Sequence, residues 1–123
     1  MILDPTLKLE AVLALAVAAN QPEVHVDYID YNQQNQPTIP SPSRTALNSA
    51  TDVTILSAPT NQRREVIRLT VYNKDTASVT VTIKTDDGTT ERIIIKAILL
   101  TLEALCWEKW RGWYSLDSNG GLK

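Results

Sequence analysis

Residues 65–117 read EVIRLTVYNKDTASVTVTIKTDDGTTERIIIKAILLTLEALCWEKWRGWYSLD, and this stretch decides the fold. It holds a close-spaced series of short strand-like runs separated by the turn signals DTA, DDG and WRG. Neighbouring runs at this spacing pair in antiparallel order. In the first two runs apolar side chains alternate with polar ones, which is the pattern of strands with one buried and one solvated face. The stretch therefore predicts an all-β domain, an antiparallel β-sandwich or barrel-like sheet.

The size and charge of the chain limit its function. With 123 residues it is long enough for one domain, which at this size buries roughly two thirds of the surface that the unfolded chain exposes. The net charge of −2, from 12 basic and 14 acidic side chains, gives no broad positive field for nucleic acid. Cys106 is the only cysteine, which excludes an internal disulfide and a multi-cysteine metal site. We therefore expect no nucleic-acid partner and no cofactor.

Residues 1–31 contain two apolar segments. The first, from Pro5 to Ala19, begins and ends like a helix, but its apolar residues scatter around a helical wheel. The second, from Glu23 to Tyr31, alternates as a strand does, and NQP between the two reads as a hairpin connection. Alternation favours a strand over a helix for the first segment too, and the prediction is a two-stranded β-ribbon arm over residues 1–31. On one side of its first strand this arm would carry Leu7, Leu9, Ala11, Leu13, Leu15 and Val17.

The same opening segment raises the question of a signal peptide or a membrane span. It lacks a positive cluster, and Asp4 and Glu10 interrupt it. Its uncharged part, residues 11–19, is far shorter than the ~20 residues that a spanning helix needs. We expect a soluble protein that is neither exported nor inserted in a membrane.

Residues 32–50 differ in composition from the rest of the chain. NQQNQPTIPSPSR, residues 32–44, has three prolines and no apolar period, which predicts an extended, solvated or partner-bound linker. Residues 51–123 then form the antiparallel β-domain. In its isoleucine-rich run, Ile93–Ile95 breaks the alternation. We expect this strand to be covered on both faces, by the other sheet or by a neighbouring subunit.

Residues that carry chemistry are few and scattered. His25 is the single histidine, and one imidazole near Asp27 is too little for a metal site or a catalytic triad. Arg63 and Arg64 fit a phosphate or carboxylate clamp, although exposed turn charges that discourage edge pairing explain them as well. The acidic residues of the 86–91 hairpin lack the spacing of a calcium loop. We therefore expect no catalytic residue and no metal ligand.

The aromatic residues near the end of the sequence are candidates for contacts. Because the chain has no phenylalanine, Trp107 and Trp113 are expected to fill the core or a subunit interface. Trp110 lies between Lys109 and Arg111 in a turn and is the best candidate for an exposed contact. The predicted partner interface combines it with apolar residues of the arm and of the loop after the isoleucine-rich strand. Its members are Leu9, Leu13, Leu15, Val17, Val26, Tyr28, Tyr31, Leu100, Leu102 and Trp110.

Several of these segments together resemble small structural proteins of tailed bacteriophages. They are the pattern RRxVxxLxVYNxDTAxVTVT at residues 63–82, the isoleucine-rich return strand and the ending GWxxLDxxG at residues 112–120. KLEAVLALAVAANQPEVHVDYID, residues 8–30, is similar to the paired opening strands of such proteins. The resemblance implies an all-β homotrimer on the virion surface, assembled in the host cytoplasm, with the major capsid protein or other virion proteins as partners.

The chain departs from this resemblance at one loop. Such proteins turn with a glycine-bearing segment after the isoleucine-rich strand, where this chain has the apolar residues 99–103. We expect this loop to be buried against another subunit.

These observations predict a non-enzymatic virion protein, foremost a capsid decoration (cement) protein that stabilises the head by bridging capsid subunits. The alternative is a neck, tail or head fibre domain that binds host-surface glycan, with Trp110 in contact, or another virion protein. A glycan hydrolase would need two opposed carboxylates in a cleft, and no spacing in the sequence indicates such a pair.

Overall fold

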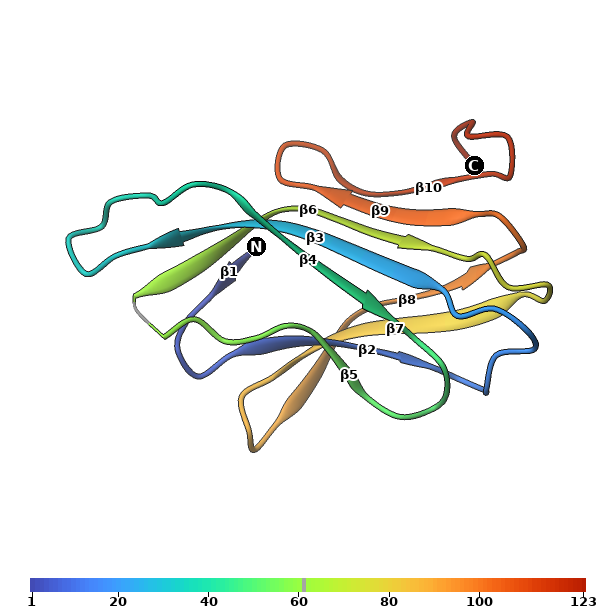
Figure 1. Cartoon of the computed structure of the whole chain (residues 1–123), viewed down its shortest axis with the longest axis horizontal. Coiled ribbons are helices and arrows are strands. Elements are labelled where there is room, and N and C mark those ends of the chain that lie inside the picture. Colours follow the sequence, from blue (N-terminus) through green and yellow to red (C-terminus); the bar gives the residue numbers. More distant parts are fainter. Residues whose placement is uncertain (61) are drawn as a thin grey trace.

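The chain folds into two antiparallel β-sheets that pack face to face (Figure 1). The computed structural model describes residues 1–60 and 62–123, and these residues contain no helix. The sheets do not close into a barrel, so the predicted all-β class is confirmed and the architecture is a β-sandwich. The strands are β1 (Ile2–Leu3), β2 (Lys8–Leu13), β3 (Glu23–Tyr31), β4 (Ser41–Ala46), β5 (Val53–Leu56), β6 (Arg63–Tyr72), β7 (Val79–Asp86), β8 (Glu91–Leu99), β9 (Ala104–Glu108) and β10 (Gly112–Leu116).

One sheet has six strands in the order β10-β9-β6-β3-β4, with β1 paired to the first residues of β6. β6 lies between β3 and β9 and directs Val66, Leu69 and Val71 into the core. A bulge opposite β3 makes Ile67 the extra residue, so Val66 points inward in its place. This shift is a local exception to the alternation predicted for the strand.

The other sheet has four strands in the order β5-β2-β7-β8. β7 buries Val79, Val81 and Ile83, and the chain then turns back into β8 through Gly88 with a φ of +91°. Glycine takes this conformation without steric cost. The hairpin predicted at this position is therefore confirmed.

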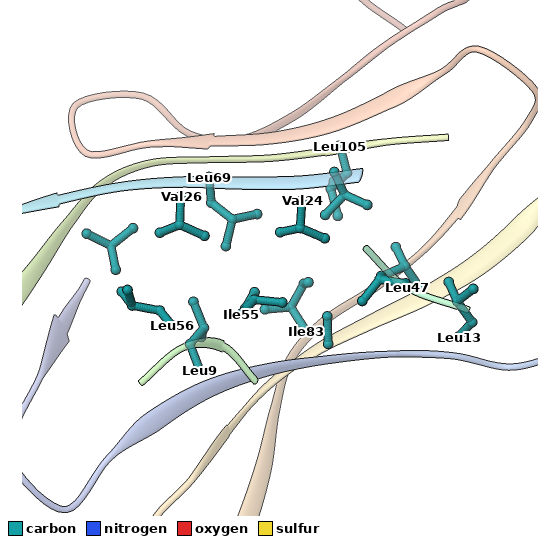
Figure 2. Close-up of a cluster of buried hydrophobic side chains, with 14 of the residues drawn as sticks. Leu9, Leu13, Val24, Val26, Leu47, Ile55, Leu56, Leu69, Ile83 and Leu105 are labelled. Carbon is teal, nitrogen blue, oxygen red and sulfur yellow. The ribbon is translucent and has the colours of Figure 1, made fainter. Parts of the chain in front are cut away.

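The hydrophobic core lies between the two sheets. In Figure 2, Leu9 and Ile83 from the four-stranded sheet face Val26 and Leu69 from the six-stranded sheet, and all four are 0% exposed. Full burial of one such side chain stabilises the fold by ~1.5–3 kcal/mol. The sandwich is therefore held together by the apolar face that each strand presents to the opposite sheet.

Residues 1–31 do not form the predicted ribbon arm. β2 pairs with β5 and β7 in one sheet, whereas β3 pairs with β4 and β6 in the other. Leu9, Leu13 and Val26, which were predicted at a partner interface, are instead buried in the core. The strand prediction itself is confirmed for residues 8–13. Alternation specifies that a strand has an apolar face, but it does not specify which strand lies beside it.

The predicted linker, residues 32–50, contains an edge strand. β4 pairs with β3, and Pro42 lies opposite Asp27. Proline lacks the N–H group of a sheet ladder but is tolerated at an edge. Leu47, just after β4, is fully buried. The prolines and polar residues therefore mark a sheet edge and not a free linker.

Candidate interaction surface

Strand β8 forms an exposed apolar edge of the four-stranded sheet. It pairs with β7 and with no other strand of the described residues. Ile93 and Ile98 are 69% and 63% exposed, and Ile94 is 36% exposed. We call these three residues the apolar edge. Within the described chain the other sheet covers only the inner face of this strand, so cover of its outer face by a neighbouring subunit stays a prediction.

A β-bulge decides which side chains of β8 face outward. Ile83 and Lys84 are consecutive in β7, yet they lie opposite Ile95 and Ile93, so Ile94 is the extra residue. Ile95 packs against the core. The bulge therefore leaves two neighbouring isoleucines exposed and then restores the alternation toward the end of the strand.

A second group of exposed leucines lies at the end of the sandwich where the β2–β3, β6–β7 and β8–β9 connections come together (Figure 1). Leu15, Leu100 and Leu102 are 79%, 53% and 45% exposed. We call these three residues the apolar end. Three members of the predicted partner interface thus lie on neighbouring loops, and no other part of the described chain buries them.

Asn73 fixes the backbone that carries two of these leucines. Its side-chain amide donates to the carbonyl oxygens of Leu99, Leu100 and Ala77 at 3.0, 3.1 and 3.0 Å. Its own carbonyl oxygen accepts from the N–H of Leu102 at 2.7 Å. Asn73 is fully buried, so these bonds satisfy groups that water does not reach. The β8–β9 connection is therefore held in one conformation.

Asp75 fixes the neighbouring β2–β3 connection in a similar way. Its carboxylate accepts from the backbone N–H groups of Ala18, Ala19 and Asn20 at 2.8, 2.8 and 3.0 Å, and from that of Thr76 at 2.8 Å. The bonds from Asn20 and the other amides lower the pKa of Asp75 to about 2, because they favour the ionised carboxylate. The N-terminal loop is thereby attached to the turn between β6 and β7.

Leu102 has a backbone conformation that suits glycine. Its φ is +67°, a region that costs a residue with a Cβ atom roughly 1–2 kcal/mol. Glu103 stabilises this turn by accepting from the N–H of Leu100 at 2.8 Å and from Lys123 Nζ at 2.7 Å. The bond from Lys123 lowers the pKa of Glu103. Leu102 is thus both strained and half exposed, as residues at binding sites often are.

The apolar edge and the apolar end meet at Thr80. This residue lines a pocket of ≈ 260 Å³ together with Leu15 and Ala16. It also lines a depression with Lys96, Ala97 and Ile98. Thr80 therefore lies between Leu15 of the apolar end and Ile98 of the apolar edge.

The outer face of the four-stranded sheet carries paired charges beside this surface. Lys84 Nζ lies 2.8 Å from Asp52 and 2.9 Å from Glu91, and the bond to Asp52 raises the pKa of Lys84. Lys8 Nζ lies 3.4 Å from Glu10 Oε2. Burial raises the pKa of Glu10, because it disfavours the ionised carboxylate.

One group of carboxylates within this face has the donor type that hard cations bind. Oxygen atoms of Glu10, Asp86 and Glu91 all lie within 4.8 Å of one another. The ammonium groups of Lys8 and Lys84 already pair with these carboxylates. The cluster is therefore an ion-pair network of the sheet face.

Trp110 lies far from the apolar end, in the β9–β10 turn at the other end of strand β9 (Figure 1). It is 89% exposed, and the ammonium group of Lys109 lies 4.7 Å from its ring centroid. Lys109 also pairs with Glu65 at 2.6 Å. Trp107 and Trp113 are partly buried against the core, as the sequence predicts.

The remaining members of the predicted interface make contacts within the chain. Val17 packs against the core. The guanidinium carbons of Arg64 and Arg63 lie 4.4 and 3.8 Å from the ring centroids of Tyr28 and Tyr31. These two tyrosines are therefore partly covered by neighbouring cations.

The other polar candidates also have internal partners or lie alone. Arg64 binds both carboxylate oxygens of Asp30, at 2.6 and 3.0 Å, and this ion pair raises the pKa of Arg64. His25 Nε2 lies 3.8 Å from Glu23 on β3. Cys106 is buried. The structure does not bring these groups together into a site.

Sequence patterns did not place the apolar edge in the predicted interface. Three consecutive isoleucines are typical of a strand covered on both faces, and the same pattern results from a bulge on an exposed edge. The isoleucine run was therefore visible in the sequence, but it did not distinguish a covered strand from an exposed edge strand with a bulge.

Comparison of the chain with protein-family models, curated proteins and solved structures finds no match. Across the described residues no helix has the length and apolarity needed to cross a membrane.

Proposed function

We propose that this chain is a non-enzymatic structural protein of a tailed-bacteriophage virion, and that it coats the capsid as a decoration protein that bridges capsid subunits. The observation that supports an assembly role is the exposure of six aliphatic side chains, Ile93, Ile94 and Ile98 at the apolar edge and Leu15, Leu100 and Leu102 at the apolar end. The kind of particle is inferred from the sequence resemblance of residues 63–82 and 112–120.

The rigidity of this surface supports a role in permanent contacts. Asn73 and Asp75 hold the loops of the apolar end through buried hydrogen bonds, so little conformational entropy remains to be lost when a partner covers the leucines. Each apolar contact contributes about 25 cal/mol per Å² removed from water. One contact is modest, but repetition over a closed lattice multiplies its effect.

The copy number of the chain in purified virions tests the proposed role. A decoration protein lines the whole lattice, so quantitative mass spectrometry against the major capsid protein is expected to give hundreds of copies in each particle. A handful of copies in each particle would contradict decoration and would place the chain at a neck, tail or fibre position.

A capsid-binding assay tests the surface itself. The double variant Leu100→Asp/Leu102→Asp places two charges at the apolar end, and we expect it to lose sedimentation with capsids that lack the wild-type chain. Ile39→Asp is the matched control, because Ile39 is 84% exposed on the β3–β4 connection. Equal binding by both variants would contradict the assigned surface.

The exposure of Trp110 favours a second candidate, a fibre domain that holds a host glycan. Its ring is 89% exposed, and exposed aromatic rings stack on sugars. In that case Trp110→Ala is expected to abolish binding of virions to host-surface glycan, and the copy number is expected to be low. A decoration protein predicts no change in adsorption for this variant.

A further inference from the structure

We propose that β8 pairs in antiparallel order with β8 of a second copy of this chain, in one register that places Glu91 opposite Lys96. The inference rests on the proposed assembly role and names the partner of the apolar edge. The two four-stranded sheets would then continue into one another across a two-fold axis.

The other sheet edges are less suited to such pairing, and β1, which pairs only with β6 among the described residues, is two residues long. β4 carries Pro42, which cannot donate to a ladder. β5 is four residues long and is packed against β3 and β4. The C-terminal segment lies along β10, because Leu122 bridges to Leu116 and the N–H of Lys123 donates to Ser115 at 3.0 Å. β8 is nine residues long and open along its outer side within the described chain.

The bulge in β8 restricts the register of self-pairing. Residues directly opposite in an antiparallel pair lie on the same face of the sheet. Glu91 lies opposite Asp86 and Ile93 opposite Lys84, on the outer face. After the extra residue Ile94, the outer face continues with Lys96. The outward residues are therefore odd-numbered before the bulge and even-numbered after it.

One self-pairing that crosses the bulge keeps every face matched. It places residue i opposite residue 187 − i, so that Glu91 faces Lys96, Arg92 faces Ile95 and Ile93 faces Ile94 of the second copy. Moving the register by one residue in either direction sets inward against outward side chains. Pairing residue i with residue 189 − i leaves the outward Ile94 opposite the inward Ile95. Pairing residue i with residue 185 − i shortens the overlap to four residues.

The chemistry of the matched faces supports a second copy as the occupant. Four isoleucine side chains, two from each copy, would cover one another at the centre, where Ile93 is 69% exposed in the free chain. A Glu91–Lys96 pair would flank them on each side by symmetry. In the free chain the Glu91 side chain is 46% exposed and contacts Lys84. If Glu91 turns to Lys96 of the second copy, Lys84 still has Asp52 as its ion-pair partner.

This arrangement predicts a dimer, whereas the sequence resemblance implies a trimer. The contact covers a short strand overlap, so we expect reversible association that is visible at high protein concentration and low salt. Sedimentation equilibrium up to about 1 mM protein covers the relevant range.

A charge exchange tests the register. Glu91→Lys alone and Lys96→Glu alone each place like charges opposite one another twice, and each is expected to raise the dimer dissociation constant about tenfold or more. The double variant Glu91→Lys/Lys96→Glu restores opposite charges and is expected to recover dimerisation. Circular dichroism on each variant verifies that the sandwich is folded, and Ile39→Lys serves as a control that leaves the constant unchanged.

Disulfide trapping provides a second readout that does not depend on charge. Glu91→Cys/Lys96→Cys places the new thiols opposite each other between copies, where a disulfide has the required Cα spacing. It is expected to give a covalent dimer on oxidation. Glu91→Cys/Ile98→Cys keeps both thiols on the outer face but not opposite each other. This variant is expected to give much less covalent dimer.

Three results would overturn the inference. They are a wild-type chain that stays monomeric up to about 1 mM, a dimer that is insensitive to the single charge reversals, and a trimer. If the chain is monomeric and Ile94→Lys still abolishes capsid binding, self-pairing is wrong while the proposed assembly role stands. If copy number excludes a virion role but the charge exchange behaves as expected, the proposed function is wrong while self-pairing stands.

Discussion

The two edges of the four-stranded sheet, β5 and β8, differ in how their apolar side chains are covered. Ile55 and Leu56 in β5 are 0% and 3% exposed, whereas Ile93 and Ile98 in β8 are 69% and 63% exposed. β5 packs against β3 and β4 of the facing sheet, and the hydroxyl of Ser43 donates to the Ile55 carbonyl at 2.9 Å. β8 has no comparable cover in the described part of the chain.

The chain thus closes one side of the sandwich itself and leaves the other side open. Its crossing from β4 to β5 brings strands of both sheets together at the closed side. A long apolar edge left unpaired promotes unwanted association. The difference between the two edges is the basis for the proposal that a partner covers β8.

The largest effect that we expect is the contrast between one isoleucine on each edge. Ile55→Ala empties a fully buried site and is expected to lower the free energy of unfolding by about 2–5 kcal/mol. Ile98→Ala shortens a side chain that is 63% exposed. It is expected to change the free energy of unfolding by less than about 0.5 kcal/mol. Urea denaturation of the monomer measures both. Similar losses for the two variants would mean that β8 is covered within the chain.

A smaller loss is expected when Asn73, which holds the β8–β9 connection of the apolar end, is replaced. Asn73→Ala leaves the carbonyl oxygens of Leu99 and Leu100 without their side-chain donor and is expected to cost about 1–3 kcal/mol. Asn32→Ala provides the control, since Asn32 makes its hydrogen bonds in an exposed turn. Chemical denaturation is the measurement, and equal losses at the two positions would contradict the anchoring role.

Replacement of the strained leucine beyond β8 is expected to act in the opposite direction. Leu102→Gly removes the cost of a φ of +67° and is expected to stabilise the monomer by up to about 1 kcal/mol. Leu100→Gly has no positive φ to relieve and is expected to destabilise it by about 0.5–1 kcal/mol. Thermal unfolding of the two variants distinguishes them. A loss of stability for Leu102→Gly would show that the leucine supports the fold itself.

The effect with the narrowest range of conditions, confined to acid pH, concerns Asp75. Its pKa in the folded chain is about 2, below the ordinary value of 3.8, so its contribution to stability is fully present above that ordinary value. This contribution is lost as the pH falls through 3.8 toward 2. The stability difference between wild type and Asp75→Asn is therefore expected to be constant at neutral pH and to shrink under acid conditions. A difference that stays constant down to pH ~2 would contradict the assigned pKa.

The strands were predictable because local alternation specifies them. Residues 65–117 gave the five strands β6 to β10, and the turn at Gly88 followed from its backbone freedom. The pairing of β2 and β3 was not predictable in this way, because Leu9 and Val26 show an apolar face equally well beside a neighbouring strand or across a core. The two segments are separated by long-range strand pairing, which joins β2 to β5 and β7 and joins β3 to β4 and β6.

The apolar end was predictable from the sequence, whereas the apolar edge was not. Leu100 and Leu102 were recognisable as apolar residues in a loop that suits glycine. The exposure of Ile93 depends on a bulge, which arises from the pairing of β8 with β7 and leaves no separate mark in the local pattern. Edge position is a property of the whole sheet and not of one segment.

Hydrogen–deuterium exchange of the backbone amides tests the central claim most directly, by comparison of β8 with β5 in the free chain and in the assembled particle. We predict that the amides of Glu91–Leu99 exchange more slowly after assembly, while those of Val53–Leu56 exchange at the same rate in both states. Unchanged exchange in β8, with protection gained elsewhere, would contradict the claim that the open edge is where this protein assembles.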